Sequence, residues 1–110
     1  YKVSKRFDDD ISSVCAAFNL EIAKNKVQSV RIAYGGMAAI PKRAIYCEKI
    51  LLNSLVTEEI IHKAKKALEK DFKPISDMRA SRLYRMEVAK NLLEKCCAEI
   101  KQKKLIGVYF

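Results

Sequence analysis

The sequence of 110 residues is poor in residues that interrupt folded structure, with three glycines, two prolines and no tryptophan. No Ser/Gly linker, low-complexity run or internal repeat divides it, so we expect one domain over residues 1–110. No apolar run approaches the roughly 20 residues of a membrane-spanning helix, and no signal peptide opens the chain. The chain should therefore be soluble. It begins at Tyr1 directly in a patterned segment, which suggests that further sequence precedes it.

Side chains that bind metals or act as nucleophiles are also scarce. The four cysteines, Cys15, Cys47, Cys96 and Cys97, form no C-x-x-C pair, and the single histidine, His62, has no second ligand at zinc spacing. No nucleophile or carboxylate stands at motif spacing from His62, which argues against general-base catalysis. We expect no metal site and buried free thiols, which favours a reducing, cytoplasmic compartment.

Positive charge is abundant: 22 Lys and Arg against 13 Asp and Glu give a net charge of +9. Such a balance attracts nucleic acid, acidic membranes or phosphorylated cofactors. The lysines are dispersed between apolar helix positions, and no aromatic-and-basic strand motif accompanies them, which favours solvated helix faces. A small basic nucleic-acid-binding module and a homo-oligomeric interaction domain remain the alternative functions.

The first third of the chain alternates in the manner of strands. Residues 12–22 place Val14, Ala16, Phe18, Leu20 and Ile22 on one face. A polar turn at residues 23–26 precedes a second alternating run over residues 27–34, so the pair predicts a long antiparallel hairpin that ends at two glycines. Residues 1–7 predict a lead-in strand, which the acidic residues 8–10 should break.

In the remainder of the chain, apolar residues recur with the period of a helix. Residues 43–52 favour a short helix, and Thr57 followed by two glutamates is a typical helix start. That helix should end at a break over residues 71–77, and the longest helix should span Ser81 to about Lys104, with Tyr84 in its apolar row. Strands followed by helices indicate an α+β fold in which the helices cover one face of the sheet.

Three segments carry a resemblance to a known family. They read Y-K-V-S-K-R-F-D-D-D-I-S-S-V at residues 1–14, V-R-I-A-Y-G-G-M-A at residues 30–38, and D-F-K-P-I-S-D-M-R-A-S-R-L-Y-R at residues 71–85. Together they resemble the C-terminal domain of flavin subunits in the xanthine dehydrogenase and carbon monoxide dehydrogenase family of molybdenum hydroxylases. The first and third are most similar to bacterial xanthine dehydrogenase small subunits.

The resemblance implies an antiparallel sheet of three to four strands on a layer of two to three helices, covering an FAD held mainly by another domain. In such enzymes a molybdenum cofactor hydroxylates a purine, 2Fe-2S clusters relay electrons to FAD, and NAD collects them. The implied partners are the FAD-binding domain and the iron-sulfur and molybdenum subunits. The chain lacks the cysteine motifs of the clusters and the glycine-rich loops for FAD pyrophosphate. Alone it should be inactive and bind no cofactor.

The resemblance also implies roles for individual residues. Lys2 matches a family lysine near the flavin ring, where a cation favours the reduced flavin. Arg6 and Asp9 match a loop that borders the flavin on the nicotinamide side, although surface salt-bridging explains them equally well.

Other residues are expected to have structural roles. An entry network for the long helix should use Asp77 or Ser76 as cap, with arginines paired to carboxylates. Asn53 and its neighbours stand where relatives often have glycine, and the apolar tail, residues 105–110, suggests a docking segment for a neighbouring subunit.

Overall fold

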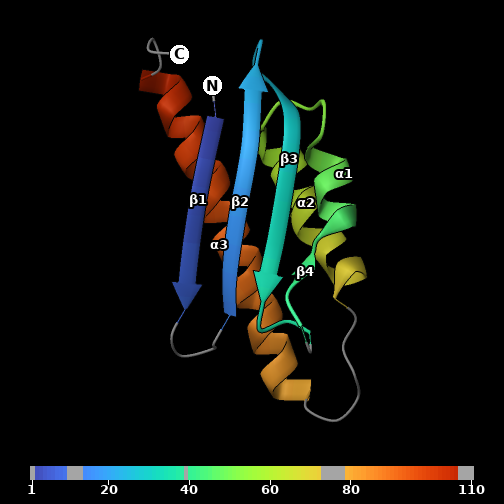
Figure 1. Cartoon of the computed structure of the whole chain (residues 1–110). Helices are drawn as coiled ribbons and strands as arrows, with labels where there is room; N and C mark the ends of the chain where they lie inside the picture. Colours follow the sequence, from blue (N-terminus) through green and yellow to red (C-terminus); the bar gives the residue numbers. More distant parts are fainter. Residues whose placement is uncertain (1, 10–13, 39, 73–78, 107–110) are drawn as a thin grey trace.

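The computed structural model describes residues 2–9, 14–38, 40–72 and 79–106, with the backbone alone for residues 79–82 and 102–106. It consists of a four-stranded antiparallel sheet with helices packed on one face (Figure 1). The α+β prediction is confirmed. In chain order the elements are β1 (Lys2–Asp9), β2 (Val14–Ala23), β3 (Lys26–Gly35), β4 (Lys42–Arg43), α1 (Ile45–Leu51), α2 (Glu58–Asp71) and α3 (Arg79–Ile106).

The sheet runs in the order β1-β2-β3-β4, and α3 packs behind β1 and β2 while α1 packs against β3 and α2 (Figure 1). The alternation in β2 is confirmed, since its five predicted apolar residues are buried while Asn19 and Glu21 are exposed. A chain of edge-to-face aromatic contacts crosses this core, from Phe7 through Phe18 to Tyr34 and on to Phe72, with centroids 5.6 to 6.1 Å apart.

The predicted hairpin turn is a two-residue loop of the primed type. Lys24 and Asn25 both have positive φ, 52° and 66°, as a type I′ turn requires. Beyond the turn Ile22 pairs with Val27 and Glu21 with Ser29, so Gln28 is an extra, bulged residue. The bulge lets buried Val27 face the core although it is out of phase with the rest of β3.

The end of β3 uses its two glycines differently. A Cβ on Gly35 would lie 2.8 Å from Sγ of Cys15 on the neighbouring strand. Gly36 has φ 86°, which side-chain-bearing residues rarely adopt. Asn53 also has positive φ (61°), a conformation that asparagine tolerates better than most residues.

Several boundaries and one element differ from the sequence-based expectation. α1 begins at Ile45 and not at residue 43, and α3 begins at Arg79 and not at Ser81. β1 continues through Asp8 and Asp9, because both remain paired with β2, opposite Cys15 and Val14. α2 continues through Asp71, whose carboxylate is held by α1. β4 adds a strand of two residues, too short for any periodicity to reveal.

The long helix α3 confirms its two apolar rows. Buried residues recur on it at helical spacing: Val88, Ala89, Leu92, Leu93, Cys96, Cys97 and Ile100. Tyr84 does not belong to this buried face, since 49% of it is exposed where the start of α3 extends beyond the sheet (Figure 1). Within the described part of the chain, no helix combines the length and apolar character of a membrane span.

Candidate functional site

The sheet face opposite the helices is open, and two of the three site residues predicted from sequence lie on it. Side chains alternate along a strand, so β1 turns Val3, Lys5 and Phe7 toward α3 while Lys2 and Arg6 stand exposed on the other side. Arg6 forms a surface ion pair with Asp8, 3.5 Å from Nε to Oδ1.

A hollow of about 440 Å³ is formed by side chains of β1, β2 and β3 at the Lys2 end of the sheet. Its lining comes from three strands: Lys2, Val3, Ser4, Asn19, Leu20, Glu21, Ser29, Val30 and Arg31. Strand pairing brings these residues together in two rows. Lys2 stands opposite Glu21, which stands opposite Ser29, and in the next row Asn19 lies between Ser4 and Arg31.

The hollow contains one internal hydrogen bond among its side chains, from Ser4 Oγ to Asn19 Oδ1 at 2.8 Å. Lys2, Glu21 and Arg31 form no ion pair and no side-chain hydrogen bond with another described residue. The hollow therefore presents two cations and one carboxylate that form no ion pair with one another, together with three neutral polar groups. Sequence reasoning identified Lys2 alone, because the others join it only through cross-strand register.

The three predicted site residues do not form one cluster. Lys2 and Arg6 share the open face but are four residues apart along β1, roughly 13 Å at the usual strand rise. Asp9 lies at the far end of the strand, on the side that faces the helices, and is partly buried. Asp10, the last of the acidic run, lies outside the described residues.

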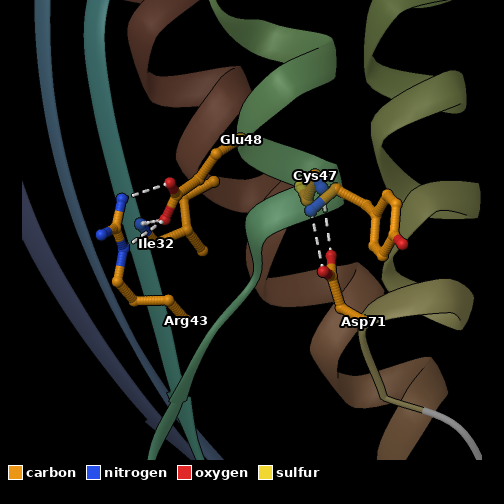
Figure 2. A network of polar contacts seen from close by, with 6 residues as sticks. Ile32, Arg43, Cys47, Glu48 and Asp71 are labelled. Atoms are coloured by element: carbon orange, nitrogen blue, oxygen red, sulfur yellow. Dashed lines mark hydrogen bonds and ion pairs between the residues drawn. The ribbon is translucent and has the colours of Figure 1, made fainter.

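A buried carboxylate, Glu48, joins the short helix α1 to the sheet (Figure 2). Glu48 is 7% exposed, and its Oε2 accepts a hydrogen bond from the backbone N–H of Ile32 at 2.9 Å. Arg43 donates to both of its oxygens, at 3.1 and 2.6 Å. Glu48 thus occupies the edge of β3 beyond the short β4.

A second carboxylate, that of Asp71 at the end of α2, caps the amino end of α1 (Figure 2). Its oxygens accept hydrogen bonds from the backbone N–H groups of Tyr46 (2.8 Å) and Cys47 (3.0 Å). These are the donors that a helix leaves unsatisfied at its start, and Ala44 at the cap position supplies no side-chain bond. Both carboxylates serve the architecture, and neither was predicted from sequence.

The buried thiols and the buried phenol of the core are held in their neutral forms. Burial raises the pKa of Cys97 to about 12 and raises the pKa of Cys47 and Cys96 as well. Burial also raises the pKa of Tyr34, whose hydroxyl donates to the carbonyl of Ala89 at 2.8 Å. The prediction of buried free thiols is confirmed for these three cysteines, while Cys15 is half-buried on the open face.

No group of three or more potential metal ligands occurs among residues 2–9, 14–38, 40–72 and 79–106. His62 is exposed on α2, as expected. Of the predicted helix-entry network, Arg85 donates to the carbonyl of Gly36 at 3.3 Å and not to a carboxylate. Ser76 and Asp77 lie outside the described residues, as do the side chains of Arg79 and Ser81.

Most paired lysines lie on the surfaces of the two longer helices, as their dispersal predicted. Three of them bridge α2 and α3, in the pairs Lys65–Glu94, Lys90–Glu69 and Lys101–Glu58. The hydrogen bond from Lys101 lowers the pKa of Glu58. Part of the positive charge is therefore matched by carboxylates on the helical side of the molecule.

Comparison with known families and proteins gives a consistent result. A family model described as the CO dehydrogenase flavoprotein C-terminal domain matches residues 1–100. The glyceraldehyde dehydrogenase medium chain of Sulfolobus acidocaldarius is 28% identical over 100 residues, covering 91% of this chain and 36% of the relative. Xanthine dehydrogenase of Emericella nidulans is 39% identical over 74 residues, covering 66% of this chain and 5% of the relative. The chain therefore spans about a third of the first relative and a small part of the second.

Solved structures share the fold. Carbon monoxide dehydrogenase from Hydrogenophaga pseudoflava superposes with a TM-score of 0.74 at 20% identity, over 86% of this chain and 34% of that one. Quinoline 2-oxidoreductase from Pseudomonas putida 86 superposes with a TM-score of 0.74 at 21% identity, over 92% of this chain and 37% of that one. At these identities the likeness extends to the fold alone.

Proposed function

The chain belongs to the CO dehydrogenase flavoprotein C-terminal domain family, and from that membership we propose that it covers the flavin of an FAD-containing subunit in a molybdenum hydroxylase. The match over residues 1–100 carries the proposal. The bare sheet face supports it: in the described part of the chain the helices all pack on the other face (Figure 1), and the alternation of β1 leaves Lys2 and Arg6 exposed on this one. The flavin would be held by a separate domain, and iron-sulfur and molybdenum subunits would complete the enzyme.

The residues of this chain fit the role of a cover and not of a complete FAD site. Its three glycines include no phosphate-cradling loop. The open face offers Lys2 and Arg6 as cations toward a flavin, while Asp9 would act only at the distant end of β1. FAD, when bound, supplies two-electron redox chemistry. This chain would supply positive charge beside it and exclude water from one side.

Within the family we propose the xanthine dehydrogenase type, with a purine as substrate and NAD as electron acceptor. Two observations support this choice: the 39% sequence identity to a xanthine dehydrogenase over 74 residues, and the amino-acid sequence of residues 1–14 and 71–85. The buried thiols suit a reducing cytoplasm. The intact enzyme, assayed with xanthine, carbon monoxide and an aldehyde, should reduce NAD fastest with xanthine. A preference for either other substrate would contradict this assignment.

The variant Lys2→Met in the intact enzyme tests the role of the open face. Removing a cation beside the flavin should lower the two-electron midpoint potential of the flavin by roughly 20–40 mV. A single charge close to the ring contributes about 1–2 kcal/mol, and for a two-electron couple 30 mV corresponds to about 1.4 kcal/mol. The measurement is a spectroscopic redox titration. Lys70→Met, which removes the same charge from the surface of α2, should leave the potential unchanged. A parent protein without flavin, or equal potentials in all three proteins, would refute the proposal.

A further inference from the structure

The hollow beside Lys2 brings charged side chains of both signs together with hydrogen-bonding side chains from three strands. It combines two cations, Lys2 and Arg31, with the carboxylate of Glu21 and the polar side chains of Ser4, Asn19 and Ser29. Opposite charges that lie directly across two neighbouring strands can form a cross-strand ion pair. Lys2 and Glu21 are direct cross-strand neighbours, yet no ion pair joins them.

The geometry lets the two cations act on a single group. Lys2 and Arg31 stand two strands and one row apart, roughly 12 Å between their Cα atoms at standard sheet spacings. Both side chains are long and exposed, so both can reach an anion placed over the middle strand. Glu21 lies in that middle strand, between Lys2 and Ser29.

The carboxylate restricts the class of ligand. A bare anion would be attracted by Lys2 and Arg31 but repelled by Glu21, whereas a ligand that carries hydroxyl donors beside its anionic group satisfies all three. Carboxylates accept hydrogen bonds from ribose hydroxyls in dinucleotide sites, and arginine and lysine bind phosphate. From this arrangement of side chains we propose that the hollow is a ribose–phosphate subsite. Lys2 and Arg31 bind the phosphate, and the Glu21 carboxylate accepts hydrogen bonds from the ribose hydroxyls.

This inference rests on the proposed function for the source of the ligand. Two dinucleotides would be present, the NAD acceptor and the FAD of the neighbouring domain, and both contain an ADP-ribose-like half. Arg31, Glu21 and Ser29 become specificity-determining residues in either case. Beyond the hollow, the next row of the open face places the small residues Ala17 and Ala33 between Arg6 and Arg43.

The test uses the intact enzyme after removal of its flavin, with ADP-ribose and inorganic pyrophosphate as probes in calorimetric titrations. Arg31→Met should weaken ADP-ribose binding about tenfold or more, the loss expected for a charge-assisted hydrogen bond. Glu21→Gln should separate the two probes, because it weakens ADP-ribose binding and strengthens pyrophosphate binding. Arg31→Lys should restore part of the affinity, and Lys70→Met on α2 should not change it.

The flavin-loaded enzyme then identifies the source. A raised KM for NAD with unchanged flavin content in Arg31→Met assigns the subsite to the acceptor, and a loss of bound flavin with unchanged KM assigns it to FAD. Equal ADP-ribose affinity in wild type and Arg31→Met would overturn the proposal, as would Glu21→Gln strengthening both probes or Arg31→Met changing only subunit association in sedimentation. A parent that contains no flavin but binds ADP-ribose through Arg31 would refute the flavin-covering function and leave the subsite standing.

Discussion

At the scale of single residues, the position of a side chain across the sheet decides what its charge does. Lys5 and Lys2 are three residues apart on β1, but Lys5 turns toward α3 and pairs with Glu99 at 3.4 Å, while Lys2 faces the open side. Glu21 and Glu48 differ in the same way, since one is exposed in the hollow and the other is buried against β3. The same residue type is therefore exposed to solvent in one place and engaged in internal contacts in the other.

Glu48 allows a test of this architectural role. Glu48→Ala would leave the buried N–H of Ile32 without an acceptor, while half-exposed Arg43 would be rehydrated. We expect the free energy of unfolding to fall by about 2 kcal/mol, the cost of an unsatisfied buried donor. Urea unfolding measures it. Glu48→Gln keeps an acceptor oxygen and should lose less, and Glu87→Ala, on the exposed side of α3, should stay within about 0.5 kcal/mol. Equal losses for Glu48→Ala and Glu87→Ala would contradict the assignment.

At the scale of elements, the start of α2 depends on one local hydrogen bond. Thr57 has extended backbone, and its Oγ1 accepts from the N–H of Ile60 at 3.2 Å. Thr57→Ala should lower the free energy of unfolding by about 1 kcal/mol, because the first turn loses its cap. Thr57→Ser preserves the hydroxyl and should lose only a few tenths. Thermal unfolding of the two variants side by side decides the matter, and a Ser variant as unstable as the Ala variant would rule out capping.

Elements with a long, regular pattern were predictable from sequence, and elements held by distant residues were not. β2 shows a period of two residues and α3 a period of 3.6 residues over ten or more positions, so their buried faces followed directly, whereas the bulge at Gln28 interrupts the period in β3. β4 has two residues, and α1 begins at Ile45 with Ala44 at its N-cap position, which supplies no side-chain hydrogen bond. Its cap comes from Asp71, 24 residues from Cys47 along the chain, a partner that no local pattern indicates.

The same reasoning explains the candidate site. Lys2 was identified from the resemblance of its segment to a family, which needs no three-dimensional information. Arg31 and Glu21 appear from sequence as ordinary outward residues of two strands. They join Lys2 only when the Gln28 bulge and the strand register are known. A cluster assembled across strands therefore requires the structure.

At the scale of the whole molecule, the core joins three elements through ionisable groups that are kept neutral. Tyr34 comes from β3, Cys47 from α1, and Cys96 and Cys97 from α3, and all four are buried. Each has its pKa raised, with burial as the largest cause. Ionisation of any one of them thus requires the layers to separate, which couples the packing of helices on sheet to pH.

The sign of this coupling makes alkaline pH destabilising. The pKa of Cys97 is about 12 in the folded chain against 9.0 for a free thiol, so above pH 9 the unfolded chain releases a proton that the folded chain retains. The stabilisation is complete below pH 9 and is lost between about pH 9 and 12, at up to about 1.4 kcal/mol per pH unit for each such thiol. Urea unfolding between pH 8 and about pH 10.5 should show this slope. Cys97→Ala should reduce the slope by one thiol's share whatever its effect on stability at neutral pH. A Cys97→Ala slope equal to that of the wild type would show that the helical layer admits water to this thiol without unfolding.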